Sequence, residues 1–124
     1  MLVAAIVDTG PHGAWAETVL ADGSLYAPEL ACAEARNIFR RREKAKLITT
    51  PQVNAARNDL MQLDFDLFPF EPFADRIWQL RHNVTSYHAW YVALAEARKR
   101  PLATLDKPLS KSNGVTCDFL TPGL

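Results

Sequence analysis

Two uninterrupted apolar runs of this chain each end on an aspartate, and this pattern constrains the fold more than any other feature. Residues 2–7 lead into Asp8, and residues 102–105 lead into Asp106. Apolar runs without alternation are typical of strands buried on both faces, which occur in parallel sheets. Ligands of open parallel sheets bind beyond the carboxyl ends of the strands. The two aspartates therefore predict a shared carboxylate site, of the kind that holds hard divalent cations.

The size and composition of the chain fit one domain with a full hydrophobic core. The chain has 124 residues, 48% of them hydrophobic, and single domains commonly contain about 100–150 residues. We therefore expect a single domain over residues 1–124. Its 14 basic and 14 acidic residues balance. This balance argues against a polyelectrolyte-like nucleic-acid coat protein, but not against an enzyme that handles nucleic acid through a local patch.

The cysteines and the first residues indicate a reducing environment. Cys32 and Cys117 lie far apart and form no CxxC pair, so we expect two reduced thiols. The apolar run after Met1 has no basic flank and no cleavage-type site, and it is too short to span a membrane. The sequence thus predicts a cytoplasmic protein without a membrane partner.

Strand-like and helix-like segments alternate along the chain, which indicates βαβ units. The fold that we expect is a three-layer α/β/α sandwich, with a mainly parallel sheet of four to five strands between layers of helices. The strands are expected at 2–8, 25–27, 65–68, 102–106 and 114–120, and the main helices at 14–21, 29–46, 50–63, 73–81 and 87–99.

Local signals refine two of these helices. Thr50 before Pro51 resembles an N-cap followed by a proline in the first helical turn. Thr85 or Ser86 is expected to cap the helix at 87–99. An apolar face at helical spacing marks that last helix, and it consists of Tyr87, Trp90, Tyr91, Leu94 and Ala97.

A third acid, Glu34, falls in the early turns of the helix after the second strand. In a parallel sheet this helix begins at the edge where Asp8 and Asp106 lie. Glu34 could instead complement the positive end of its helix, and either aspartate could form a turn or cap a helix. Three acids at one edge favour metal binding. Carboxylates about 4 Å apart repel by roughly 4 kcal/mol at an effective dielectric near 20, and a divalent cation between them removes this repulsion.

The segment from Arg81 to Glu96 (RHNVTSYHAWYVALAE) resembles the signature helix of PIN-domain toxins of the VapC type. The resemblance extends over nearly the whole chain. Val7-Asp8-Thr9 resembles the opening strand and first acid of the family, residues 27–30 with Glu34 and Asn37 its second motif, and residues 101–106 its final motif.

The resemblance implies a small PIN-like α/β/α nuclease, the toxin half of a type II toxin–antitoxin pair, which cuts RNA with Mg²⁺ or Mn²⁺ held by four acids. Three of these acids match Asp8, Glu34 and Asp106, and His88 stands at the fourth position. Imidazole suits Mn²⁺ or Zn²⁺ better than Mg²⁺. The chain is then inactivated, or active with weaker metal binding, or adapted to another metal; we favour impaired activity, because charge holds the ion. His88 could also act as a general base.

Other residues fit supporting roles in such an enzyme. The resemblance further implies a cognate VapB-like antitoxin, an RNA substrate and a homodimer. The alternative is a catalytically inactive PIN-like domain that binds RNA or protein. A flavodoxin-like module is less favoured, because no glycine-rich phosphate loop follows the first strand of this chain. Thr9, Asn37 and Thr104 would orient the acids, and Arg36, Arg40 and Arg41 would contact RNA or antitoxin.

Overall fold

The computed structural model describes residues 25–104 and 107–120, together with residues 18 and 21. The strand expected at 2–8 and nearly all of the helix expected at 14–21 lie outside the described residues. The same holds for three expected site residues, Asp8, Thr9 and Asp106. The chain divides into two compact units, one containing Leu30–Asp66 and the other containing Tyr26–Glu29 and Leu67–Leu124. Each unit is described by itself.

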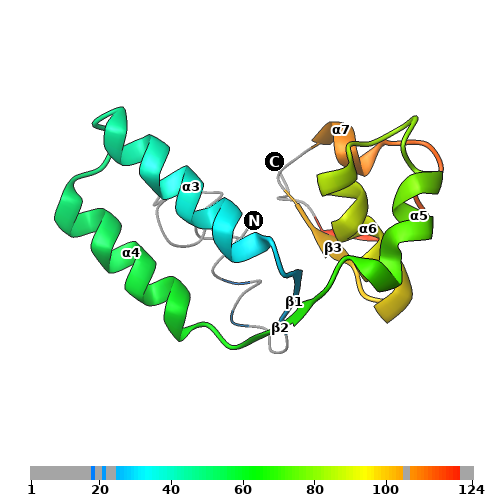
Figure 1. Ribbon diagram of the computed structural model, residues 1–124, viewed down its shortest axis with the longest axis horizontal. Coiled ribbons are helices and arrows are strands. Elements are labelled where there is room, and N and C mark those ends of the chain that lie inside the picture. Colours follow the sequence, from blue (N-terminus) through cyan, green and yellow to red (C-terminus); the bar gives the residue numbers. More distant parts are fainter. Residues whose placement is uncertain (1–17, 19–20, 22–24, 105–106, 121–124) are drawn as a thin grey trace. The chain divides into compact units, whose positions relative to one another are not determined.

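The first unit contains a helical hairpin in which α3 (Ala31–Lys44) and α4 (Thr50–Gln62) lie side by side (Figure 1). This agrees with the helices expected at 29–46 and 50–63. The two helices bury one small cluster between them, and Ile38, Ile48 and Leu63 pack against its edge. The buried members of the cluster are Ala35, Phe39, Val53, Ala56 and Leu60.

The start of α4 differs by one residue from the expected N-cap at Thr50. Thr49 is the cap: its side-chain oxygen accepts the backbone N–H of Gln52 at 3.3 Å, and the Gln52 side chain accepts the backbone N–H of Thr49 at 2.9 Å. This reciprocal pair is a capping box. Thr50 lies inside the first turn, where its hydroxyl donates to Glu43 of α3 at 2.8 Å. Thr49 is the cap instead of Thr50 because Gln52, three residues after Thr49, completes this capping box.

The strands alternate with helices, as the sequence predicted. The strand β1 (Leu25–Pro28) pairs with β2 (Phe65–Phe68), and β3 (Leu102–Ala103) pairs in parallel with β4 (Phe119–Leu120). Between β2 and β3 lie the 3-10 turn η1 (Glu71–Phe73), α5 (Ala74–Gln79) and α6 (Ser86–Arg98), while α7 (Lys107–Ser110) follows β3.

The described strands form two pairs, which is a partial view of the expected sheet of four to five strands. Several segments are shorter than expected, and α3, for example, occupies Ala31–Lys44 of the expected 29–46. The last strand occupies only residues 119–120 of the expected 114–120, and the helix expected from residue 73 begins as a helix at Ala74. Among the described residues, no helix is long and apolar enough to cross a membrane.

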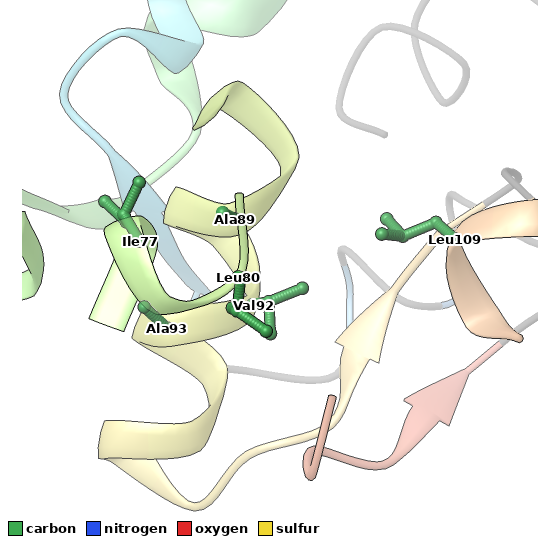
Figure 2. Packing of buried hydrophobic residues seen from close by; sticks show 6 residues of the cluster. All are labelled: Ile77, Leu80, Ala89, Val92, Ala93 and Leu109. Carbon is green, nitrogen blue, oxygen red and sulfur yellow. The ribbon is translucent and has the colours of Figure 1, made fainter. Parts of the chain in front are cut away.

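The core of the second unit lies where α5 packs against α6 (Figure 2). Ile77 and Leu80, expected to face inward, are buried, and Leu109 reaches the same cluster from α7. The expected apolar face of α6 is only partly correct, because Tyr87 is 61% exposed and Ala97 is also exposed. Small residues let two helices approach closely, so they form the contact face instead. The buried residues of α6 are Ala89, Val92, Ala93, Leu94 and Ala95.

Candidate metal centre

Glu34 lies in the first turn of α3, where its backbone N–H donates to the carbonyl of Leu30 at 3.0 Å. The side chain is half-buried, because α3 turns Ala31 and Ala35 inward on either side of it. Asn37 lies one turn further along the same helix and is exposed. Residues three apart are neighbours on a helix surface. The structure therefore brings Glu34 and Asn37 to one side of α3.

His88 lies in the first turn of α6 and is exposed. Thr85 caps this helix, since its side-chain oxygen accepts the backbone N–H of His88 at 3.3 Å. This confirms the first of the two expected caps. The imidazole therefore stands at the positive end of a helix, a position that favours an anionic side chain. A carboxylate at position 88 would be stabilised there.

Thr104 is buried and directly follows β3. Its backbone N–H donates to the carbonyl of Leu120 at 2.9 Å, and that of Leu102 donates to the carbonyl of Asp118 at 2.8 Å. These bonds fix β3 against β4 up to the last described residue before residues 105–106. The chain that leads to Asp106 is thus anchored by a parallel strand pair.

Two of the four expected ligands, Glu34 and His88, belong to the described residues. Asp8 and Asp106 lie outside the described residues, and Glu34 and His88 belong to different compact units. Within the described part of the chain, no group of three or more metal-ligating side chains occurs. The chemistry of the donors still fits a divalent cation: three carboxylates supply the hard oxygen ligands of Mg²⁺, and an imidazole is the one donor that suits Mn²⁺ better.

The basic residues expected to contact RNA or antitoxin lie on α3 outside its buried face. Arg36, Arg40 and Arg41 are exposed. The guanidinium of Arg36 donates to the carbonyl of Cys32 at 3.1 Å, which ties it to its own helix. Since Ala31, Ala35 and Phe39 point into the core, the basic side chains are available on the surface of the first unit.

A polar network that the sequence analysis missed lies in the second unit. Arg76 of α5 binds the carboxylate of Glu96 on α6 with two hydrogen bonds, of 2.7 and 3.0 Å. A third bond from Arg76 reaches the carbonyl of Gly114 at 2.7 Å, and Thr116 donates both its backbone N–H and its hydroxyl to Glu96. The network ties two helices to the segment before β4. The sequence signal for this network is Glu96, a charged residue one turn from the buried Val92 and Ala93.

The hydrogen bonds of this network fix the charge of its members. Arg76 lowers the pKa of Glu96 to about 2, although burial acts in the opposite direction. Burial raises the pKa of the nearby Cys117 thiol, and the charge of Glu96 adds to this effect. Cys32 and Cys117 are both free, as expected.

Curated relatives of this chain are ribonucleases. Ribonuclease VapC1 of Mycobacterium tuberculosis is 40% identical over 94 residues, which cover 75% of this chain and 71% of the relative. Ribonuclease VapC9 of the same organism is 30% identical over 102 residues, 82% of this chain and 80% of the relative. Ribonuclease VapC12 is 31% identical over 106 residues, 86% of this chain and 82% of the relative. No family model matches the chain.

The alternating strands and helices, with one parallel strand pair, define a mixed α/β protein. Its candidate ligands are of the types found in metal-dependent enzymes. The chain belongs to the VapC ribonucleases, a family of PIN-domain toxins.

Proposed function

We propose that this chain is the toxin of a type II toxin–antitoxin pair and an endoribonuclease that cuts RNA phosphodiester bonds with Mg²⁺ or Mn²⁺. One observation carries the proposal: 40% identity to a ribonuclease over 75% of the chain. The position of Glu34 in the first turn of α3 supports it, since the positive end of a helix stabilises an anionic ligand.

In this mechanism Asp8 and Asp106 are the main metal ligands, and Glu34 is a further ligand or positions the attacking water. A cation held by these residues would lower the pKa of a water molecule and would stabilise the charge of the attacked phosphate. Thr9, Asn37 and Thr104 orient the acids by hydrogen bonds. Thr104 is suited to this role because it is buried and anchored at the end of β3.

His88 replaces the fourth acid of the cluster in this proposal, and it weakens metal binding. The site loses one negative charge, and a neutral imidazole is a poor ligand for Mg²⁺. We therefore expect reduced activity in Mg²⁺ and a preference for Mn²⁺. His88 also supports the alternative function, a catalytically inactive PIN-like domain that binds RNA or a protein, because a site that does not hold its metal would not cut RNA.

The decisive experiment compares this chain with its His88→Asp variant. Calorimetry measures the binding of Mg²⁺ and Mn²⁺, and a cleavage assay with labelled RNA measures activity in each metal. We expect the variant to bind Mg²⁺ at least tenfold more tightly, a change worth about 1.4 kcal/mol, and to cut RNA faster. The original chain should bind Mn²⁺ better than Mg²⁺.

Two controls make the result specific. His82→Asp adds the same charge at another exposed histidine and should change neither metal binding nor cleavage. Asp106→Asn in the His88→Asp background should abolish cleavage. Equal cleavage by the original chain and His88→Asp would disprove the impaired site, and a lack of metal binding by both would disprove the ribonuclease function.

The remaining parts of the proposal concern organisation. Residues 1–124 form one PIN-like domain, a three-layer α/β/α sandwich, and the protein acts in the cytoplasm as a homodimer that a VapB-like antitoxin neutralises. Arg36, Arg40 and Arg41 contact RNA or the antitoxin, an assignment supported by their exposure on α3.

A further inference from the structure

Two arginines of the second unit are stacked on aromatic rings at the C-terminal end of α6. The guanidinium carbon of Arg98 lies 4.6 Å from the ring centroid of Phe68 and 5.1 Å from that of Tyr26. The guanidinium carbon of Arg100 lies 5.8 Å from the Tyr26 centroid. The two rings meet edge to face, with centroids 5.7 Å apart. Together these four residues form what we call the arginine–aromatic cluster.

The backbone at the end of α6 brings the two arginines to the same ring. Lys99 adopts a left-handed conformation with φ of 54°. The N–H of Lys99 donates to the carbonyl of Glu96 at 3.2 Å, and that of Arg100 donates to the carbonyl of Ala95 at 3.0 Å. Such a pair of bonds turns the chain back at the helix end. The backbone that carries Arg98 and Arg100 is therefore fixed by hydrogen bonds.

The cluster carries positive charge that no acid neutralises among the described residues. The one ion pair described for these parts of the chain joins Arg76 to Glu96, so the glutamate closest in sequence to Arg98 is already engaged. Arg98, Lys99 and Arg100 follow one another and are all exposed. A guanidinium stacked on a ring keeps its N–H groups free at its edge, where they can bind a phosphate with two hydrogen bonds.

We propose that the arginine–aromatic cluster binds the phosphate backbone of single-stranded RNA at a distance from the catalytic residues. This inference rests on the proposed ribonuclease function. Cationic side chains interleaved with aromatic rings are typical of surfaces that bind single strands without reading sequence. Arg98 and His88 lie at opposite ends of α6, ten residues apart, which is about 15 Å along the helix axis. The cluster therefore contacts nucleotides away from the scissile bond and adds affinity for long RNA only.

The test measures RNA binding without cleavage, by fluorescence anisotropy of a short strand of about 6 nucleotides and a long strand of about 25 nucleotides. The Arg98→Ala/Arg100→Ala variant should bind the long strand about tenfold more weakly and the short strand with unchanged affinity. Its dependence on salt should flatten, since each lost phosphate contact removes roughly 0.7 from the slope of log K against log salt.

Three further variants separate RNA binding from folding. Arg57→Ala removes an exposed arginine of α4 and should leave both affinities unchanged. Arg100→Ala alone leaves both ring contacts of Arg98 in place and should still weaken the long strand selectively. Arg98→Lys keeps the charge but loses the planar group, so it should show an intermediate effect. Thermal melting of each variant confirms that the comparison is made on folded protein.

The possible outcomes are distinct. Equal loss for both strands, or no loss for either, overturns the inference while the ribonuclease function stands. If the variants keep their affinity for RNA but lose affinity for polyglutamate, the cluster serves an acidic protein segment and the RNA assignment is wrong. If the original chain binds neither strand, both this inference and the proposed function are wrong.

Discussion

The residue that most affects the proposed chemistry, His88, occupies a position that favours a negative charge. Its backbone N–H is bound by the cap Thr85 in the first turn of α6. Peptide dipoles make this end of a helix partly positive, which stabilises a carboxylate. The residue type at position 88 therefore affects the local stability of α6 as well as the proposed metal site.

The first prediction follows from this position and needs no metal. In EDTA at low salt, the helix end should raise the free energy of unfolding of His88→Asp by about 0.3–1 kcal/mol, and repulsion from the other proposed acids reduces this gain. Urea denaturation measures the change, and His82→Asp, outside any helix, should give no gain. A marked loss of stability in His88→Asp would mean that repulsion between the proposed acids, or lost contacts of the imidazole, outweighs the helix dipole.

The second prediction concerns Glu96 and the pH dependence of stability. Hydrogen bonds from Arg76 hold the pKa of Glu96 at about 2, below its ordinary value of 4.5. The native state thus favours the ionised carboxylate. Its stabilising contribution is fully present above about pH 4.5 and is lost as the pH falls toward 2. At pH 7, Glu96→Gln should lower the free energy of unfolding by roughly 1–3 kcal/mol.

Urea denaturation between pH 7 and pH 2 tests this expectation. The difference between the original chain and Glu96→Gln should shrink steadily below about pH 4.5, because the carboxyl of the original chain becomes neutral too. Glu71→Gln, at an exposed position in η1, serves as the matched control and should have little effect at any pH. A difference that stays constant to pH 2 would show that charge is not the source of the stabilisation.

At the scale of elements, the ends of the helices explain where the sequence was easy to interpret and where it was not. Thr49, Thr50 and Thr85 are all suitable caps by residue type. The observed caps Thr49 and Thr85 are those whose backbone is extended and whose hydroxyl reaches the third helical residue. A capping box specifies Thr49, because Gln52 completes the reciprocal bond.

The third prediction tests this box. Thr49→Ala should lower the free energy of unfolding by about 1 kcal/mol, since it leaves the backbone N–H of Gln52 without its side-chain partner. Chemical denaturation gives the value, with Asn54→Ala on the exposed side of α4 as the control. A cost of less than a few tenths of a kcal/mol would mean that water replaces the cap without loss.

The orientation of α6 could not be deduced from its apolar spacing. Tyr87 and Trp90 dominate the hydrophobic content of one side, yet the interior is formed by Ala89, Val92 and Ala93. The neighbouring α5 and its C-cap contribute large side chains, Ile77 and Leu80, so the facing surface of α6 has to be small. Packing requires complementary side-chain volumes, and the sequence of one helix does not specify the size of the side chains on the helix that faces it.

At the scale of the whole molecule, the proposed metal site draws ligands from almost the full length of the chain. Asp8 and Asp106 come from opposite parts of the sequence, and Glu34 and His88 come from between them. A cation bound to all of them would stabilise only the folded chain. Metal binding and global stability are therefore linked.

The fourth prediction uses this linkage. Mn²⁺ at about 100 times its dissociation constant should raise the free energy of unfolding by about 2.7 kcal/mol, and EDTA should reverse the gain. Thermal melting with and without the metal measures it. Glu34→Gln should abolish most of the shift, while Glu71→Gln should retain it. An unchanged melting temperature in saturating Mn²⁺ would contradict a metal site that spans the chain.

The sequence alone determined the order of elements, because local signals are sufficient for them. Apolar runs, helical spacing and polar caps predicted α3, α4, α6 and both β1 and β2 to within a few residues. The same motifs that placed Glu34 and His88 at helix starts also carried the resemblance to VapC toxins. Local chemistry and family membership are therefore readable from the order of residues.

Only the tertiary structure decided which faces meet. The pairing of Arg76 with Glu96, twenty residues away, and the stacking of Arg98 on Tyr26 and Phe68 depend on elements far apart in the chain. No periodicity encodes such contacts, because they arise from the way helices and strands fit together in space. The two aspartates that end apolar runs indicated a metal-dependent enzyme, and the packing around α6 added the stabilising network and the arginine–aromatic cluster.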